Sequence, residues 1–261
     1  VLSPLLFNLF MSDLPSFLPK IGISYNQVLV NFIAYADDVA FMAESEKDLQ
    51  RLLDSLHEYC VINRLVVNVE KTKVMVFHKG RLPKCKFTYD VQHLELVKSF
   101  QYLGFVFTQQ LSFSKHCDMV VGKARSRAGY LFNKLQIQHL NLELAVKIFN
   151  IYILPDLTYG SPLWMSNCSE SSLTTLNATF TKYLKRYFGL PRWTNNAIVH
   201  HLSNTKPLTH TLCEKAITQF GGLVFPQLVS SLQLSFLILW HGLKKIYFIN
   251  MFPLIFGDHT N

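Results

Sequence analysis

Two adjacent aspartates, Asp37 and Asp38, stand in the middle of an apolar run, NFIAYADDVAFMAES, at residues 31–45. Three explanations are open. The pair can form a solvated turn, because Asp suits turns. It can bind Mg²⁺, which prefers oxygen ligands, for phosphoryl or nucleotidyl transfer with two metal ions. It can also form ion pairs with basic residues elsewhere. A structural role for the pair in a dry core is disfavoured, since burying two uncompensated carboxylates is very costly.

The residues on both sides of the aspartates indicate the elements that position them. Val, Ile, Phe and Tyr dominate residues 28–43, and Ala36 with the two aspartates interrupts them, which predicts two strands joined by a tight turn. A helix follows from about residue 46, because Ser45 and Asp48 are placed like a capping box. Its apolar face is predicted to consist of Leu49, Leu52, Leu53, Leu56 and Cys60.

The rest of the chain changes character near Ser112. Before it, Pro4 to Leu14 predicts a helix with Ser3 as its cap, and RLVVNVEKTKVMVF predicts a turn and then a strand from about Lys73 to Phe77. FTYD and FQYLGFVFTQ predict two more short strands. After Ser112, long amphipathic helices are predicted at Ser114 to Leu135, Leu142 to Ile153 and Glu170 to Phe188, the first with a core-facing stripe of Val120, Ala124, Ala128, Leu131 and Leu135.

Composition narrows the function class. The 261 residues contain 25 Lys and Arg against 17 acids, a net charge of +8 that favours a polyanionic partner such as nucleic acid. The five cysteines are widely spaced, which indicates reduced thiols of an intracellular protein, nuclear or cytoplasmic and not secreted. The apolar stretch from Pro226 to Gly242 falls short of a membrane span, so we expect a buried helix there and no stable membrane association.

The strings around the aspartates also occur together in a known family. YADD between apolar strand residues, preceded by LSPLLFNLFMSDL and followed by VNVEKTKVMVF and YLGFVF, resembles the reverse transcriptases, above all those of non-LTR (LINE-type) retrotransposons. The resemblance implies an α+β fold: a partial polymerase palm, with a short antiparallel sheet and packed helices, followed by an all-α thumb-like bundle. It implies a palm at residues 1–110 and a thumb and connection region at 111–220, and it leaves 221–261 unassigned.

The resemblance also implies roles for individual residues. Asp37 and Asp38 would be the acidic pair of the palm hairpin and would bind the two Mg²⁺ ions of the intact enzyme, with Asp37 as the direct ligand. Lys71 would lie near the nucleotide phosphates, with Lys73 as the alternative. Further implied contacts are to template and nucleotide (Ser3, Pro4, Tyr35, Ala36), to the primer (Tyr102, Leu103, Gly104, Phe105) and to the nucleic-acid backbone (Lys123, Arg125, Arg127, Lys134).

Each of these roles has a local structural alternative. Ser3 can be a helix cap only, and Lys71 and Lys73 can be solvated charges at a turn. Tyr102, Leu103 and Phe105 can be core strand residues, and the cations after Ser112 can form a solvated helix face. Arg192 and Trp193 could stack on bases, although a buried Trp is the commoner outcome.

The sequence departs from the family in one respect that bears on activity. A working reverse transcriptase carries a third palm carboxylate on a strand before the SPLL helix, and the numbering here begins at that helix. We therefore expect these residues to belong to a longer RNA-directed DNA polymerase that uses an RNA template, a DNA primer and dNTPs, and to be inactive alone. The alternative is a retroelement remnant that binds nucleic acid without catalysis.

Overall fold

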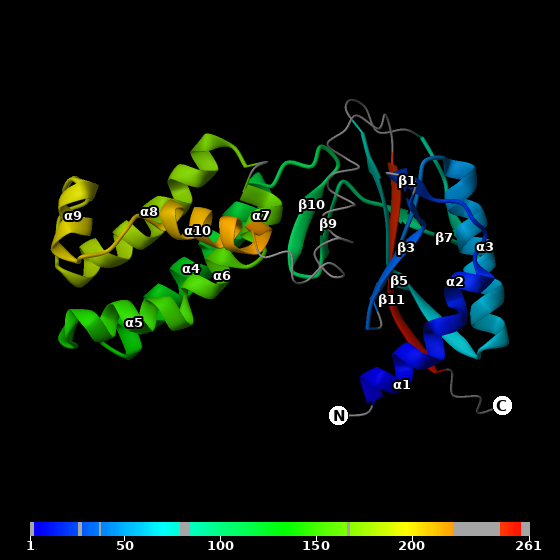
Figure 1. The fold of residues 1–261 in the computed structure, drawn as a ribbon, viewed down its shortest axis with the longest axis horizontal. Coiled ribbons are helices and arrows are strands. Elements are labelled where there is room, and N and C mark those ends of the chain that lie inside the picture. Colours follow the sequence, from blue (N-terminus) through cyan, green and yellow to red (C-terminus); the bar gives the residue numbers. More distant parts are fainter. Residues whose placement is uncertain are drawn as a thin grey trace. The chain divides into compact units, whose positions relative to one another are not determined.

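The computed structural model describes residues 3–25, 28–36, 38–78, 84–165, 168–221 and 246–256. The chain divides into two compact units, the first formed by residues 1–111 with 230–261 and the second by residues 112–229. The first unit combines sheets with helices, and the second is helical (Figure 1). The fold is α+β, as the sequence predicts.

The first unit contains short helices, one long helix and the strands of four small sheets. The helices are α1 (Ser3–Phe10), the 3₁₀ helix η1 (Met11–Asp13), α2 (Leu14–Phe17) and α3 (Glu46–Ile62). The strands are β1 (Ile23–Tyr25), β2 (Val28–Val30), β3 (Phe32–Tyr35), β4 (Asp38–Ala43), β5 (Leu65–Phe77), β6 (Thr88–Tyr89), β7 (Gln92–His93), β8 (Glu95–Leu96), β9 (Ser99–Tyr102), β10 (Phe105–Thr108) and β11 (Ile246–Phe256).

The largest sheet has the strand order β3-β4-β11-β5-β8. The central strand β11 comes from the end of the chain and pairs antiparallel with β4 on one side and β5 on the other. The strands β4 and β5 are therefore parallel to each other, and α3 forms the crossover between them. This crossover skips one strand position, which β11 fills.

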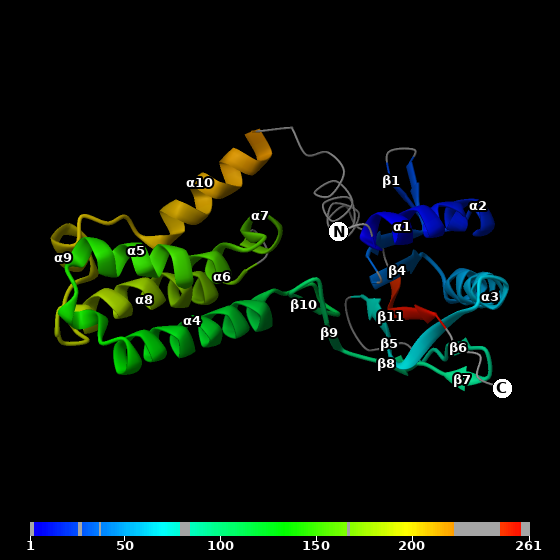
Figure 2. The same cartoon turned by 90° about the horizontal axis from the view of Figure 1, so that it is seen from below.

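The core of the first unit lies between this sheet and its helices. Alternate residues of β4, Val39, Phe41 and Ala43, are buried on one face together with Ile249 of β11 and alternate residues of β5. The apolar side of α3 covers this face, and α2 contacts α3 (Figure 2). Because strand side chains alternate between faces, this packing fixes which side of the sheet each β4 residue faces.

The long helix α3 begins where the sequence predicts. The Ser45 hydroxyl accepts a hydrogen bond from the Asp48 amide at 3.1 Å, which satisfies one of the free donors of the first turn. All five predicted apolar residues of this helix are buried. The cap and the apolar face could both be predicted from the sequence, because they depend on residues that are close together in the chain.

The prediction for β5 was wrong at its start. The strand begins at Leu65 and not near Lys73. Asn68 pairs with Phe252 and Lys73 with Asn250, so residues 69–72 stand opposite Met251 alone and form a wide bulge. Within this bulge the Asn68 side chain accepts a hydrogen bond from the Lys71 amide at 3.0 Å. The turn-like residues of EKTK therefore form an irregularity inside one strand.

The hairpin of β9 and β10 contributes aromatic side chains to the opposite face of the sheet. The Tyr102 ring lies 5.9 Å from the ring of Phe248 on β11, and Phe248 also contacts Phe77 of β5 at 6.0 Å. Leu103 and Gly104 form the turn of the hairpin, with φ angles of 46° and 83°. The YLGF string is therefore a strand end, a two-residue turn and a strand start, and not one continuous strand.

The second unit is built from helices. Among the described residues, none of the five cysteines forms a disulfide. The predicted helices at residues 114–135, 142–153 and 170–188 are present, each to within one residue at its end. Its elements are α4 (Ser114–Lys134), the 3₁₀ helix η2 (Ile137–His139), α5 (Leu142–Tyr152), α6 (Leu154–Thr158), α7 (Ser161–Trp164), α8 (Glu170–Tyr187), α9 (Asn196–Leu202) and α10 (Leu208–Gly221).

Aromatic packing holds the long helices of this unit together. Phe149 of α5 lies 4.4 Å from Phe180 and 4.8 Å from Tyr183 of α8, measured between ring centroids, and Phe132 of α4 lies 5.3 Å from Tyr183. The predicted core stripe of α4 is right for Val120, Ala124 and Leu131, which are buried, while Ala128 is half-buried. It is wrong for Leu135, which is 53% exposed because α4 ends at Lys134.

Among the helices of the described residues, none combines the length and apolar character needed to cross a membrane. The helix expected between Pro226 and Gly242 lies outside the described residues.

Candidate active site

The acidic pair lies at the turn between β3 and β4. Tyr35 pairs with Asp38 across the hairpin, which leaves Ala36 and Asp37 as the two loop residues. Ala36 adopts a left-handed conformation with φ of 52°, as two-residue hairpin turns require. Asp37 itself lies outside the described residues. The predicted strand, turn and strand are thus confirmed for the residues on both sides of Asp37.

Asp38 opens β4 and is half-buried. It shares its face of the strand with Ala40 and Met42, which is the face that also carries Phe248 and Tyr102. Burial raises the pKa of the Tyr102 phenol well above its usual range, and the negative charge of Asp38 raises this pKa further. The carboxylate and the buried phenol are therefore close enough to interact.

The Tyr102 hydroxyl is a buried polar atom with no hydrogen-bond partner among the described residues. Buried hydroxyls are normally hydrogen-bonded, because an unsatisfied one costs about 1 to 3 kcal/mol. Such an atom beside a half-buried carboxylate indicates a polar site rather than simple core packing. The sequence placed Tyr102 on the primer side and gave no signal of its proximity to Asp38.

The chemistry of Asp38 fits one ligand of a magnesium ion, because carboxylate oxygens are the ligands that Mg²⁺ prefers. The residues that the structure describes contain no group of three or more His, Cys, Asp or Glu side chains able to hold a metal ion. The role of Asp38 as a metal ligand therefore stays a prediction.

The two candidate lysines differ in their surroundings. Lys71 lies in the β5 bulge and is exposed. Lys73 forms an ion pair with Glu95, with 2.6 Å between Nζ and Oε2. Lys73 pairs with Asn250 of β11, and Asn250 pairs with Ala40 of β4. Lys73 therefore lies on the same face of the sheet as Ala40 and Asp38, two strand spacings or about 10 Å from Ala40. The role of Lys71 stays a prediction.

The other predicted contacts fall on separate elements of the first unit. Ser3 and Pro4 begin α1, and Tyr35 is exposed at the end of β3. Tyr102 and Phe105 are buried on either side of the β9–β10 turn, while Leu103 and Gly104 form the turn itself. Among these residues, Tyr35 pairs with Asp38 across the hairpin, and the charge of Asp38 raises the pKa of Tyr102.

The four predicted backbone-binding cations all lie on α4 in the second unit. Lys123, Arg125 and Lys134 are exposed. Arg127 has a structural role, because its Nε lies 3.0 Å from Asp156 Oδ2 and its Nη1 donates a hydrogen bond to the Tyr152 carbonyl. Its guanidinium also lies 5.0 Å from the centre of the Tyr152 ring. Arg127 thus ties α4 to the end of α5 and to α6.

Replacing Arg127 by Met is expected to lower the free energy of unfolding of the second unit by about 1.5 to 3 kcal/mol, the range of hydrogen bonds to charged groups. Urea denaturation followed by circular dichroism measures this. Arg125→Met is the matched control, because Arg125 is exposed on the same helix. Equal stability of both variants, together with a loss of nucleic-acid binding in Arg127→Met alone, would show that Arg127 faces a ligand instead.

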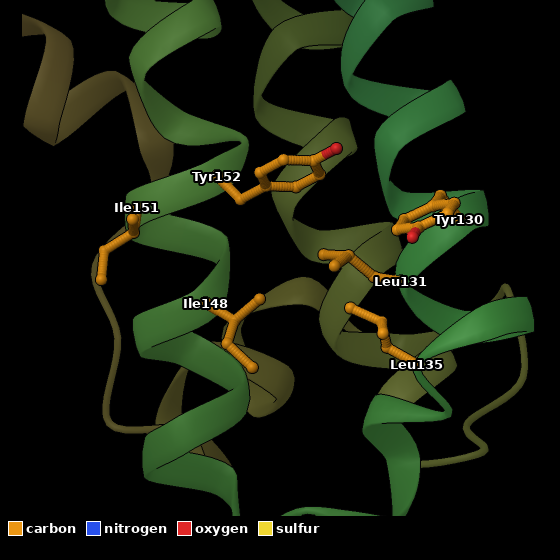
Figure 3. A pocket seen from close by; sticks show the side chains of 6 residues that line it. All are labelled: Tyr130, Leu131, Leu135, Ile148, Ile151 and Tyr152. Atoms are coloured by element: carbon orange, nitrogen blue, oxygen red, sulfur yellow. The ribbon is translucent and has the colours of Figure 1, made fainter.

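Two grooves of the second unit were not evident from the sequence. One, of about 400 Å³, lies between α4 and α5, where Leu131, Leu135 and Ile148 point toward one another (Figure 3). Its lining is apolar apart from two tyrosine hydroxyls. The other, of about 760 Å³, lies along α8 and carries four cationic side chains. The charge excess after Ser112 was visible in the sequence, but its convergence on one groove was not.

Comparison with known proteins finds similarity to reverse transcriptases. Residues 1–107 match the family model described as reverse transcriptase (RNA-dependent DNA polymerase). The RNA-directed DNA polymerases from the mobile element jockey of Drosophila funebris and of Drosophila melanogaster are each 25% identical over 73% of this chain and 21% of their own length. The retrovirus-related Pol polyprotein from a type-2 retrotransposable element of Drosophila melanogaster is 35% identical over 41% of this chain and 11% of its own length.

The chain spans about a fifth of the length of the jockey relatives. The family match covers the β3–β4 hairpin, which contains Asp38, together with α3, β5 and the β9–β10 turn. Residues 1–107 are therefore similar to a reverse transcriptase domain, and the similar proteins named here come from mobile elements.

Proposed function

We propose that the first unit is the catalytic palm segment of an RNA-directed DNA polymerase of a LINE-type retrotransposon. The observation that carries this proposal is the hairpin turn that holds Asp38 at the start of β4, where its charge acts on the buried Tyr102 hydroxyl, which has no hydrogen-bond partner among the described residues. The reverse transcriptase match over the same residues supports it. The substrates would be a dNTP, an RNA template and a DNA primer.

The reaction would join the primer 3′ oxygen to the α-phosphorus of the nucleotide and release pyrophosphate. Two Mg²⁺ ions, when bound, would activate the attacking oxygen and neutralise the leaving oxygens. Asp37 and Asp38 would hold these ions, with Asp37 as the direct ligand. Because β3 and β4 hold the turn by backbone pairing, the carboxylates would be positioned before the substrate arrives.

The remaining predicted residues would position the substrates. Lys71 would lie near the nucleotide phosphates, and Ser3 with Pro4 near the template. Tyr35 and Ala36 would complete the turn beside the primer end. The hairpin at Tyr102 to Phe105 would support the primer strand.

A polypeptide of residues 1–261 alone is expected not to extend a primer at a measurable rate. The described residues contain no group of three His, Cys, Asp or Glu side chains able to hold a metal ion, and losing an essential metal ligand removes several kcal/mol of transition-state stabilisation. The measurement is extension of a DNA primer on an RNA template with dNTPs and Mg²⁺. Robust extension by this polypeptide, abolished by Asp37→Asn, would contradict the expectation.

The same incomplete set of carboxylates favours a second candidate function, a retroelement remnant that binds nucleic acid without catalysis. A polypeptide extended at its N-terminus by the natural upstream residues separates the two candidates. Extension activity in that longer polypeptide supports the polymerase, and nucleic-acid binding without activity supports the remnant.

A further inference from the structure

Four positive side chains converge on the groove of about 760 Å³ in the second unit. They are Lys182, Lys185 and Arg186 near the end of α8, and Arg192 in the loop that leads to α9. None of the residues that line this groove is acidic. We call it the basic groove.

The wall of the basic groove is held in place by the end of α8. The Leu190 amide donates a hydrogen bond to the Lys185 carbonyl at 2.8 Å, and the Gly189 amide donates one to the Arg186 carbonyl at 3.3 Å. Gly189 has a φ of 65°, which completes a Schellman turn after the helix. The Lys185 ammonium donates to the Arg192 carbonyl at 2.9 Å and thereby fastens the loop to the helix. The groove is therefore formed before any ligand binds.

The cations of the groove are not neutralised within the unit. Arg186 is oriented by the Phe132 ring, 4.4 Å from its guanidinium carbon, and by the Asn133 side chain, to which it donates a hydrogen bond. Lys182 and Arg192 are exposed. Throughout the described part of the chain, no acidic side chain forms an ion pair with any of the four. Such a concentration of like charge attracts a polyanion.

An exposed tryptophan follows Arg192 of the groove directly in the sequence. Trp193 follows Arg192 in the loop and is 86% exposed, whereas Trp164 of the same unit is completely buried. The sequence left open whether Trp193 would be a core residue, and the structure places it in solvent. An aromatic ring beside a row of cations is the arrangement with which proteins bind single-stranded nucleic acid, since each unpaired base can stack on the ring.

We propose that the basic groove binds the phosphates of a single-stranded nucleic acid while a base stacks on Trp193. The ligand is a single strand because duplex bases are already stacked on one another and offer no free face to the ring. The choice of nucleic acid as the ligand rests on the proposed function, but the site lies in the second unit and uses none of the residues of the acidic hairpin. The basic groove is also distinct from the cations of α4, among which Arg127 forms an ion pair with Asp156.

The test is fluorescence anisotropy with the full 261-residue chain in EDTA and without dNTP. Labelled single-stranded RNA, single-stranded DNA and a duplex of equal length are titrated at several salt concentrations. Trp193→Ala is expected to weaken binding of single strands about tenfold, and Trp193→Phe to keep most of the affinity. The double variant Lys182→Gln/Arg192→Gln is expected to reduce the slope of log affinity against log salt by about 1.4, at about 0.7 for each lost phosphate contact.

Lys206→Gln is the matched control, because Lys206 is an exposed lysine of the same unit that pairs with Glu214 outside the groove. It is expected to bind like the wild type. The proposal is overturned if Trp193→Ala binds single strands with wild-type affinity, if Lys206→Gln lowers affinity as much as the groove variants, or if polyglutamate competes as well as the oligonucleotide. Thermal unfolding of each variant identifies losses of affinity that are due to misfolding. If Trp193→Ala misfolds, the affinity of Trp193→Phe decides whether the aromatic ring binds the strand.

The outcome is separable from that of the polymerase assay. Asp37→Asn is expected to leave this binding unchanged, because the hairpin is not in the groove and no metal ion is present. Single-strand binding that depends on Trp193, together with no primer extension by the N-terminally extended polypeptide, would refute the polymerase and support the groove. RNA bound more tightly than DNA would identify the template as the ligand, and the reverse would identify a DNA strand.

Discussion

Asparagine at position 37 or 38 is expected to lower the rate of RNA-templated DNA synthesis by at least about 1,000-fold in a polypeptide that includes the natural upstream residues. The substitution keeps the shape of the side chain and removes the charge that holds Mg²⁺. Losing about 4 kcal/mol of transition-state stabilisation corresponds to this factor. Asp37→Asn is expected to have the larger effect, because Asp37 is the proposed direct ligand. Single-turnover primer extension with saturating dNTP measures both.

Glu58→Gln is the control for this pair of variants. Glu58 is an exposed acid on α3 of the same unit, so its loss removes one negative charge without touching the hairpin. We expect it to extend the primer at the wild-type rate. If Asp37→Asn and Asp38→Asn both keep their rates within tenfold of the wild type, the carboxylates do not hold the catalytic metals.

The second large effect is expected at the central strand β11. Ile249 is completely buried and pairs with Phe41 of β4 and Val74 of β5. Ile249→Asp would place an unpaired carboxylate in the apolar core between the sheet and α3, which is expected to cost on the order of 4 kcal/mol of unfolding free energy. Hydrogen exchange is the measurement, and amides of β4 and β5 are expected to lose their protection.

Val66→Asp is the matched control, because Val66 is an exposed residue of β5 in the same sheet. Its stability is expected to stay close to that of the wild type. Unchanged protection of β4 and β5 in Ile249→Asp would show that β11 does not bridge these strands in solution.

Features set by neighbouring residues were predictable from the sequence. The start of α3 follows from Ser45 and Asp48, three residues apart, and the turn at Ala36 follows from the break in an apolar run. The long helices of the second unit follow from their apolar period. In these cases the local conformational preference and the final fold agree, so the sequence pattern alone is enough to predict the element.

Features set by distant residues were not predictable. The strand β11 belongs to a segment without a clear apolar period. Its neighbouring residues Phe248 and Ile249 point to opposite faces of the sheet and are both buried, so apolar and polar residues need not alternate there. The early start of β5 depends on pairing with β11 across the bulge. Whether Trp193 is buried depends on what packs against its loop, and Tyr102 meets Asp38 through tertiary packing alone.

The most direct test of the account locates the metal ions. Fe²⁺ replaces Mg²⁺ in the longer polypeptide with template, primer and dNTP, and ascorbate with peroxide then cleaves the backbone next to the bound iron. The account predicts cleavage around residues 35–39 that excess Mg²⁺ suppresses and that the Asp37→Asn/Asp38→Asn double variant lacks. Cleavage confined to other parts of the chain, or equal cleavage at the hairpin of the double variant, would contradict it.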